Sequence, residues 1–284
     1  NGAFDIGGSS TVQGDVAAGA DGSDGDATIT GGSRVGGELT TPKSVSADAG
    51  SSVGGSVSAD GSATFDDAEV DGAVDAGGTV TLSNDGVVRD DVTTDAGVSA
   101  SGNALIGGNV NADSSISLSS STVRGTLTAA GSVTVSSGST VSGSIDGGSG
   151  VDVSDSTVEG NVDAAGSFSC SNATINGQNC SEYKKPRFDI TIVNTNSPIS
   201  AGDTLTVETA IENTRYDTGT RNVTLEIDGS PTDSTNITLD GGDSTTATFS
   251  WTTDPGNSDR GDHTATVTTD NSRDRPDSRT VTVN

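Results

Sequence analysis

Apolar and polar residues alternate in two short motifs that recur through residues 4–180. The first motif has the form apolar-x-Gly-x-apolar, as in Val35–Leu39, and its copies start 17 or 18 residues apart after a first step of 23. The second has the form apolar-x-apolar, as in Val80–Leu82, and keeps the same period and phase. Residues two or four positions apart point to one face of a strand. Each repeat therefore predicts short strands with one aliphatic face.

A period of 17 or 18 residues predicts the coils of a three-sided β-helix, an all-β solenoid, over residues 1–180. Gly, Ser, Asn and Asp between the motifs supply the bends. Stacking each coil on the last buries the aliphatic faces and pairs the backbone groups. The glycine at the centre of the first motif predicts a tight corner or a close approach of two backbones. Asp90 takes its place in one copy, so we do not expect glycine to be obligatory there.

The longer first step predicts a loop at one corner of the solenoid, within residues 17–26. The loop contains Asp21, Asp24 and Asp26, and carboxylates are ligands that Ca²⁺ prefers. Their spacing matches neither an EF-hand loop nor the nonapeptide calcium repeat. We interpret the loop as a solvated acidic segment, keep the three residues as weak metal candidates, and expect no cofactor.

Two cysteines occur near the end of the repeat region. Cys170 takes an inward position in the last regular coil, and Cys180 lies where the first motif decays. A disulfide between them would close the C-terminal end of the solenoid, where a stack of coils needs a cap. It would also indicate an oxidising, extracellular setting. Two buried thiols are the alternative.

The pattern changes after the solenoid. Residues 181–186 break the repeat and are interpreted as a linker, and residues 187–284 form a second domain. About seven short alternating stretches separated by turn residues are typical of an antiparallel, immunoglobulin-like β-sandwich. The expected strands are Arg187–Val193, Thr204–Asn213, Asn222–Asp228, Ser234–Leu239, Thr245–Thr252, His263–Thr269 and Arg279–Val283.

The chain is strongly acidic, with 40 Asp and Glu against 13 Lys and Arg and a formal net charge of -27. This disfavours nucleic acids and anionic membranes as partners, because both need basic patches. Dispersed acidity with few lysines resembles proteins of salt-loving archaea, where the Debye length of about 3 Å at 1 M salt screens self-repulsion. Simple solubility is the alternative. No apolar run reaches the roughly 18 residues of a membrane span.

The sequence offers only weak candidates for a catalytic site. Asp66 and Asp67 are adjacent, as are Asp90 and Asp91, but neighbours on a strand point to opposite faces. We interpret both pairs as surface charge. His263, the sole histidine, lacks a Ser or Cys partner pattern. No Gly-rich loop leads from a strand into a helix, which excludes a phosphate-binding loop. We expect no enzymatic activity.

Four Asn-x-Ser/Thr sequons mark candidate N-glycosylation sites. Their acceptors are Asn172, Asn179, Asn222 and Asn236. If an archaeon exports the protein, we expect at least one of them to carry a glycan.

The solenoid motifs, such as Val53–Val57 followed by Ala63–Phe65, resemble those of the bactofilin family of polymer-forming proteins over about residues 4–180. The resemblance implies a right-handed β-helix that polymerises end to end without nucleotide. Left-handed hexapeptide helices have a coil of about the same length and are the alternative. The glycine-centred motif favours the bactofilin type.

The C-terminal residues resemble the CARDB family of immunoglobulin-like domains of prokaryotic cell surfaces. The resemblance is carried by Ala201–Val207, Val223–Gly229 and Thr248–Trp251, among others, whereas Arg215–Arg221 is longer and more charged than the usual turn. It implies adhesion or spacer roles and no chemistry. Trp251 is most simply the core tryptophan of such a domain, with a glycan-stacking platform as the alternative.

Together these features predict an extracellular structural subunit of a surface filament or pilus that acts by self-association and displays its sandwich. We expect assembly to use the N-terminal coil around Phe4 and Ile6, because the disulfide and the sandwich would block the other end. A monomeric or trimeric adhesin or tail-fibre receptor-binding protein is one alternative, and a polysaccharide-degrading β-helix enzyme is a less favoured one. The sequence leaves open whether an upstream anchor or pilin-like helix was removed.

Overall fold

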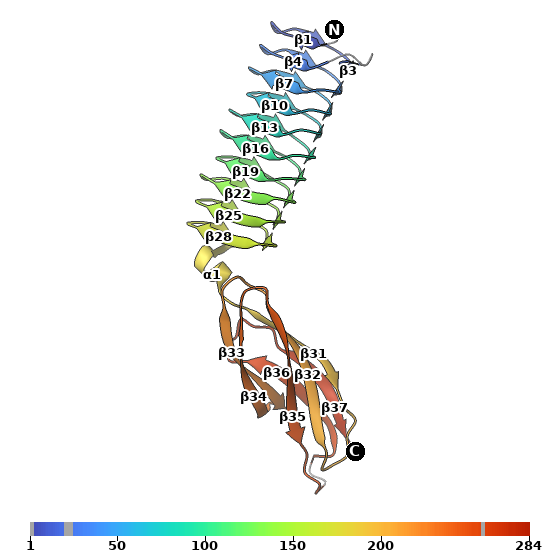
Figure 1. Ribbon diagram of the computed structural model, residues 1–284, viewed down its shortest axis with the longest axis vertical. Coiled ribbons are helices and arrows are strands. Elements are labelled where there is room, and N and C mark those ends of the chain that lie inside the picture. The colour runs from blue at the N-terminus through green and yellow to red at the C-terminus, as the bar shows by residue number, and fades with distance from the viewer. Residues whose placement is uncertain (1–2, 20–24, 257–258) are drawn as a thin grey trace. The chain divides into compact units, whose positions relative to one another are not determined.

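The structure, a computed structural model, describes residues 3–19, 25–256 and 259–284. The chain divides into two compact units, Asn1–Cys180 and Ser181–Asn284. Strands make up nearly all the regular structure of both units (Figure 1). The predicted all-β fold is confirmed: the first unit is a β-solenoid and the second is a β-sandwich.

The solenoid consists of three sheets, because each coil contributes one strand to each sheet (Figure 1). Sheet A contains β1 (Phe4–Ile6), β4 (Ala27–Ile29), β7 (Val45–Asp48), β10 (Ala63–Asp66), β13 (Val80–Ser83), β16 (Val98–Ser101), β19 (Ile116–Ser119), β22 (Ser132–Ser136), β25 (Gly150–Ser154) and β28 (Ser167–Ser171). Sheet B contains β2 (Thr11–Val12), β5 (Arg34–Val35), β8 (Ser52–Val53), β11 (Glu69–Val70), β14 (Val87–Val88), β17 (Leu105–Ile106), β20 (Thr122–Val123), β23 (Thr140–Val141), β26 (Thr157–Val158), β29 (Thr174–Ile175) and β30 (Gln178–Asn179). Sheet C contains β3 (Val16–Ala17), β6 (Leu39–Thr41), β9 (Val57–Ala59), β12 (Val74–Ala76), β15 (Val92–Thr94), β18 (Val110–Ala112), β21 (Leu127–Ala129), β24 (Ile145–Gly147) and β27 (Val162–Ala164).

Aliphatic side chains from all three sheets fill the interior of the solenoid. Neighbouring strands pair in parallel, and Val80 of sheet A is in register with Ala63 before it and Val98 after it. Equivalent positions of successive coils therefore stack in columns. Phe65 of sheet A and Val70 of sheet B are fully buried. Burial of one such side chain contributes roughly 1.5–3 kcal/mol, so each coil is stabilised by its contacts with the next.

The corner between sheets B and C holds the central glycine of the first motif. Gly125 N donates to Gly108 O at 3.0 Å, and Gly143 N donates to Gly125 O at 3.1 Å. A Cβ atom on Gly143 would lie 2.5 Å from Gly125 O, so the predicted close approach of backbones is confirmed. Where Asp90 replaces glycine, no hydrogen bond joins its N to Gly72 O among the residues that the structure describes. The corner thus accepts one Cβ atom at the loss of one backbone hydrogen bond.

The C-terminal end of the solenoid departs from the parallel pattern. β30 turns back and pairs with β29 in antiparallel register. A short helix, α1 (Cys180–Lys184), follows and occupies most of the segment expected to be a linker. Glu182 in its first turn and Lys184 in its last complement the helix dipole.

The second unit has two antiparallel sheets. One contains β31 (Phe188–Thr195), β32 (Thr204–Asn213) and β35 (Ser244–Thr252), and the other contains β34 (Ser230–Leu239), β33 (Gly219–Ile227), β36 (Gly261–Thr269) and β37 (Asp277–Val283). A strand is found at each of the seven expected places, and β33 and β34 begin three and four residues earlier than predicted. They meet at Asp228 and Gly229, whose φ values of 49° and 78° suit a two-residue hairpin turn. The stretch Arg215–Arg221 is therefore only partly a loop.

Candidate functional site

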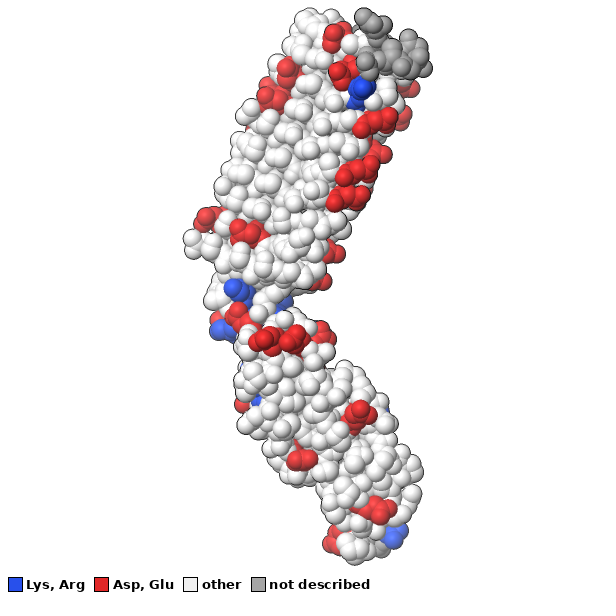
Figure 2. All heavy atoms as spheres, in the orientation of Figure 1, with Lys and Arg blue, Asp and Glu red and all other residues white. Residues whose placement is uncertain are grey.

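The surface charge of the solenoid is unevenly distributed over its three sheets. Residues 1–180 hold 23 of the 40 Asp and Glu but only 4 of the 13 Lys and Arg. Asp75, Asp146 and Asp163 occupy outward positions of sheet C, and Asp95 and Asp113 directly follow two of its strands. Figure 2 shows a row of acidic side chains along one edge of the solenoid.

The central strands of sheet A present only hydroxyl groups on their outward side. We call this surface the hydroxyl face. It comprises Thr81, Ser83, Ser99, Ser101, Ser117, Ser119, Ser132, Thr134 and Ser136, the outward residues of β13, β16, β19 and β22. Over β13 to β19 the surface drawn in Figure 2 has no charged side chain. We did not predict this face, although Ser or Thr at the middle position of the second motif was a visible signal.

The structure places the adjacent acids singled out in the sequence at strand ends, turns and corners of the solenoid. Asp66 lies on sheet A, where its Oδ1 accepts from Asn84 Nδ2 at 2.6 Å. Asp67 is in the following turn, with a φ of 49°. Asp91 Oδ1 accepts from Asn109 N of the next coil at 2.6 Å. The carboxylates of Asp66 and Asp91 thus accept hydrogen bonds from the next coil.

Only one of the three weak metal candidates falls within the described residues. Asp21 and Asp24 lie outside them. Asp26 is exposed, and its Oδ1 accepts from Ser44 N at 3.0 Å. Among the residues that the structure describes, no group of three or more His, Cys, Asp or Glu side chains could hold a metal ion.

An ion-pair cluster on sheet B was missed in the sequence. Arg89 Nε donates to Glu69 Oε1 at 2.6 Å and to Asp71 Oδ1 at 3.1 Å. These contacts raise the pKa of Arg89, chiefly through the hydrogen bond to Glu69. The partners are 18 and 20 residues apart, about one coil, so the repeat period was the signal that could have found them. Because the side chains are exposed, the cluster adds little stability.

Cys170, from β28, forms a disulfide with Cys180, the first residue of α1. Their Cα atoms are 5.8 Å apart. The bond ties the last strand of sheet A to the helix and closes a loop over the final coil.

The four sequon asparagines are all at or near the surface. Asn172 and Asn179 are exposed near the end of the solenoid. Asn222 and Asn236 are direct partners across β33 and β34, and Asn222 Nδ2 donates to Asn236 Oδ1 at 3.1 Å. A glycan on Asn222 Nδ2 would stand directly beside Asn236, so the two sites of the sandwich are not independent.

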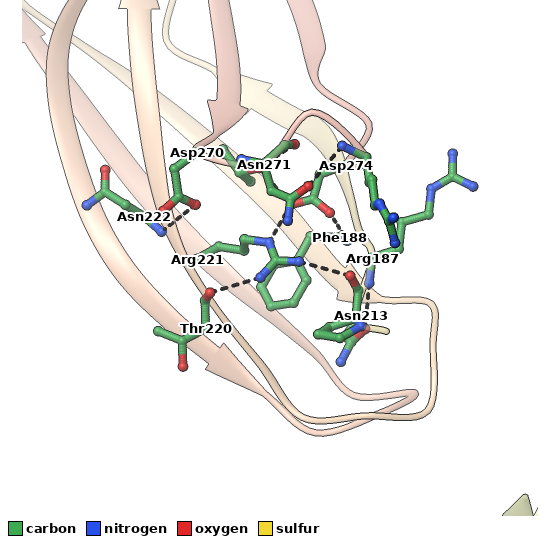
Figure 3. Close-up of polar contacts among 12 residues, drawn as sticks. Arg187, Phe188, Asn213, Thr220, Arg221, Asn222, Asp270, Asn271 and Asp274 are labelled. Carbon is green, nitrogen blue, oxygen red and sulfur yellow. Dashed lines mark hydrogen bonds and ion pairs between the residues drawn. The ribbon is translucent and has the colours of Figure 1, made fainter. Parts of the chain in front are cut away.

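A buried ion pair connects Arg221 of β33 to Asp274 in the loop before β37 (Figure 3). Arg221 Nε donates to Asp274 Oδ2 at 2.7 Å, and the two side chains are 11% and 2% exposed. Asp274 also accepts from Phe188 N at 2.8 Å and from Thr269 Oγ1 at 2.6 Å. The Arg221 guanidinium lies over the Phe188 ring and donates to the Pro186 carbonyl at 2.9 Å. This cluster is structural, because every group in it has a partner within the unit.

Basic residues near this cluster are also paired. Arg273 Nη2 donates to Glu182 Oε2 at 2.6 Å, and Lys185 Nζ also contacts Glu182. Hydrogen bonds from Lys185 and Arg273 lower the pKa of Glu182. The small pocket lined by Lys185, Arg221 and Arg273 therefore has its positive charge offset internally.

His263 joins two turns of the sandwich. Its Nδ1 lies 2.7 Å from Asp228 Oδ2, and its Nε2 lies 2.8 Å from the Asp259 carbonyl. Trp251 packs edge-on against the imidazole, with ring centroids 5.1 Å apart. Trp251 is half-buried at the margin of the core. Both residues thus have structural contacts, and neither lies beside a nucleophilic side chain in the contacts described.

The contact between His263 and Asp228 predicts that the sandwich loses stability as the pH rises. The hydrogen bond to Asp228 raises the pKa of His263 above its ordinary value of about 6.5. The stabilisation of the folded sandwich by this contact is therefore complete below about pH 6.5, and it is lost as the pH rises through the folded-state pKa of His263. Asp228 has its pKa lowered, first by the Thr264 backbone and then by His263, so its contribution is lost only in acid.

Thermal unfolding followed by Trp251 fluorescence tests this prediction. The midpoint temperature of unfolding is expected to decrease as the pH is raised from about 6 to about 9. The decrease is expected to be smaller in a His263→Gln variant. Equal slopes in the two proteins would contradict the prediction.

Comparisons with known proteins identify the second unit. Residues 185–279 match the CARDB family model. Among solved structures, the CARDB domain of a Pyrococcus furiosus protein, determined in complex with di-metal ions, is 16% identical with a TM-score of 0.30, and the match covers 36% of this chain and 94% of that one. A β-glucosidase from Listeria innocua in complex with glucose is 19% identical with a TM-score of 0.31, over 34% of this chain and 16% of that one. A β-glucosidase from Erythrobacter marinus is 16% identical with a TM-score of 0.30, over 35% and 16% of the two chains.

No curated protein matches the chain. This chain spans 16% of the length of either glucosidase. In the described part of the chain, no helix has the length and apolarity needed to cross a bilayer. The protein therefore combines an N-terminal β-solenoid with a C-terminal CARDB domain.

Proposed function

We propose that the protein is a non-enzymatic structural subunit of an extracellular filament or pilus of an archaeal cell surface, formed by self-association of its solenoid. The observation that carries the proposal is the uninterrupted stack of parallel coils, filled by small aliphatic side chains. Such a stack is a stiff spacer, and its strand edges can pair with further strands. The CARDB domain is then the displayed part, suited to adhesion or spacing.

The charge of the chain supports a halophilic setting for this filament. With a net charge of -27, copies repel one another over about 10 Å at 0.1 M salt but over only about 3 Å at 1 M. Assembly is therefore expected to require molar salt. The disulfide and the four sequons fit an exported glycoprotein.

In this proposal, end-to-end contact uses the coil that holds Phe4 and Ile6. Phe4 is half-buried, whereas Ala27, its partner in the next coil, is fully buried. Asp5, between Phe4 and Ile6, points outward. These neighbouring positions allow a matched pair of variants that introduce the same charge on opposite faces of one strand.

Electron microscopy and sedimentation velocity in about 0.1 M and about 3 M KCl test the proposal. Wild-type protein is expected to form filaments at high salt. Phe4→Lys is expected to abolish them, and Asp5→Lys is expected to leave them intact. Discrete particles of one subunit at every salt concentration would refute the filament, and hydrolysis of a polysaccharide that Asp66→Asn or Asp91→Asn abolishes would refute the non-enzymatic role.

A further inference from the structure

One small pocket of the CARDB domain is lined by cations and by no carboxylate. Residues 181–284 hold 17 Asp and Glu but only 9 Lys and Arg. Even so, this pocket, with a volume of about 320 Å³, is lined by Lys185, Pro186, Arg221, Asn271 and Arg273. Its volume is at the lower end of the range for small-molecule sites. The pocket therefore has the size and the charge to bind a small anion.

Two hollows on the solenoid surface have a different character. One is lined by Asp67, Glu69 and Asp85 as well as by Arg34, so acids outnumber cations around it. The other is lined by hydroxyl groups and by Asp152, with no cation among its lining residues. Positive charge thus distinguishes the CARDB pocket from these hollows, in a chain whose formal net charge is -27.

Three separate segments of the domain bring the cations to this pocket. Lys185 follows α1, Arg221 lies on β33, and Arg273 lies between β36 and β37. Glu182 contacts both Lys185 Nζ and Arg273 Nη2, and it therefore holds the two groups side by side. The Arg221 side chain is 11% exposed, whereas those of Lys185 and Arg273 are about half exposed. A ligand would thus meet Arg221 at the base of the pocket and the other two cations at its rim.

The internal ion pairs offset two of the three positive charges of the pocket. Lys185 and Arg273 share the carboxylate of Glu182, and Asp274 balances Arg221. One positive charge is therefore left over, and neither carboxylate lines the pocket. An oxyanion would supply the missing counter-charge, and the hydrogen bonds that Arg and Lys donate to such groups are among the strong ones.

The cations also keep hydrogen-bond donors that the protein does not use. An arginine side chain has five N–H donors, and a lysine ammonium has three. Arg221 uses three of its donors, one to Asp274 and two to backbone carbonyls. Lys185 and Arg273 each use one, in the side-chain contacts of the described residues. The remaining N–H groups are open to the oxygen atoms of a ligand.

Asn271, drawn with Arg221 in Figure 3, adds an uncharged donor to the lining. Its Oδ1 accepts from Arg273 N at 3.0 Å. In the described part of the chain, its Nδ2 donates to no protein group. The amide can therefore hold its donor toward a ligand while its oxygen is bound within the loop.

We propose that this pocket binds the oxyanion group of a small ligand, the class that includes inorganic sulfate and acidic sugars. The site belongs to the CARDB domain alone and does not depend on self-association of the solenoid. It goes beyond the proposed function, because it gives the displayed domain a ligand of stated chemistry.

Nuclear magnetic resonance titrations of the full chain test the site. Potassium sulfate, glucuronate or acetate replaces KCl at constant ionic strength, so that the screening of charges does not change. Sulfate and glucuronate are expected to shift the side-chain signals of Asn271 and Arg273 in a saturable way. Glucose, the neutral reference, is expected to leave these signals in place.

Two matched double variants assign the binding to the pocket. Lys185→Gln with Arg273→Gln removes two cations from its lining, and Lys184→Gln with Arg275→Gln removes two neighbouring cations that do not line it. The two variants have the same net charge, so a general effect of charge would weaken binding equally in both. The first is expected to have a dissociation constant for sulfate about tenfold higher or more than that of the second.

A single variant provides a test that preserves the loop. Asn271→Asp retains an oxygen to accept from Arg273 N, but it replaces the amide donor by a carboxylate. It is expected to abolish binding of both anions while the unfolding midpoint stays close to that of wild type.

The outcomes separate the source of the ligand and the fate of the proposal. Tighter binding of glucuronate than of acetate would indicate an acidic sugar, whereas equal or weaker binding would indicate a free anion such as sulfate; both results support the site. No saturable shift with sulfate or glucuronate, or equal weakening by the two double variants, would overturn it. These results do not depend on filaments, because the titration reports on the CARDB domain whether or not the protein assembles.

Discussion

Replacing Asp274 by alanine is expected to lower the free energy of unfolding of the CARDB domain by about 3–5 kcal/mol, the usual cost of breaking a buried ion pair from one side. The Asp274 side chain is 2% exposed and accepts from Arg221 Nε. Its loss leaves a buried guanidinium without a counter-charge. It also removes the acceptor for Phe188 N and Thr269 Oγ1, and buried donors without partners are costly.

Urea unfolding monitored by Trp251 fluorescence measures this effect in the full chain, because the single tryptophan reports on the sandwich alone. Asp270→Ala is the matched control, since Asp270 is exposed in the same loop and its loss should cost less than about 1 kcal/mol. A double variant, Arg221→Met with Asp274→Leu, is expected to recover much of the lost stability. A cost for Asp274→Ala no larger than for Asp270→Ala would show that the pair is unimportant.

Replacing Gly143 by alanine is expected to destabilise the solenoid by about 1–3 kcal/mol or more, the range for overpacking. Its Cβ atom would lie 2.5 Å from Gly125 O and 2.6 Å from Thr126 N. Both contacts are with the backbone of the preceding coil, which cannot move aside without breaking the hydrogen bonds between coils.

Gly14 provides the control, because it is the same glycine of the motif in the first coil and a Cβ atom there meets nothing within 4 Å. Gly14→Ala is expected to be neutral or slightly stabilising, since alanine restricts the unfolded chain. Far-ultraviolet circular dichroism during thermal unfolding measures both variants. Equal midpoints for Gly143→Ala and Gly14→Ala would contradict the corner argument.

The sequence alone was sufficient for the architecture of the solenoid, because a solenoid is nearly one-dimensional and each coil contacts only its neighbours. Strict alternation, as in Val80 and Leu82, determines which side chains point inward, and the period determines which positions stack. The sandwich strands were predicted to within a few residues at most ends for the same local reason. The early start of β33 at Gly219 was missed because charged residues there resemble a loop.

The tertiary structure alone decided which side chains meet. The pairs Arg221–Asp274 and His263–Asp228 are 53 and 35 residues apart. No local pattern links them, because their contacts depend on the pairing of β33 with β36, two strands of one sheet that are far apart in the sequence. The same holds for the hydroxyl face. Only stacking in register gathers the outward hydroxyl groups of β13, β16, β19 and β22 onto one surface.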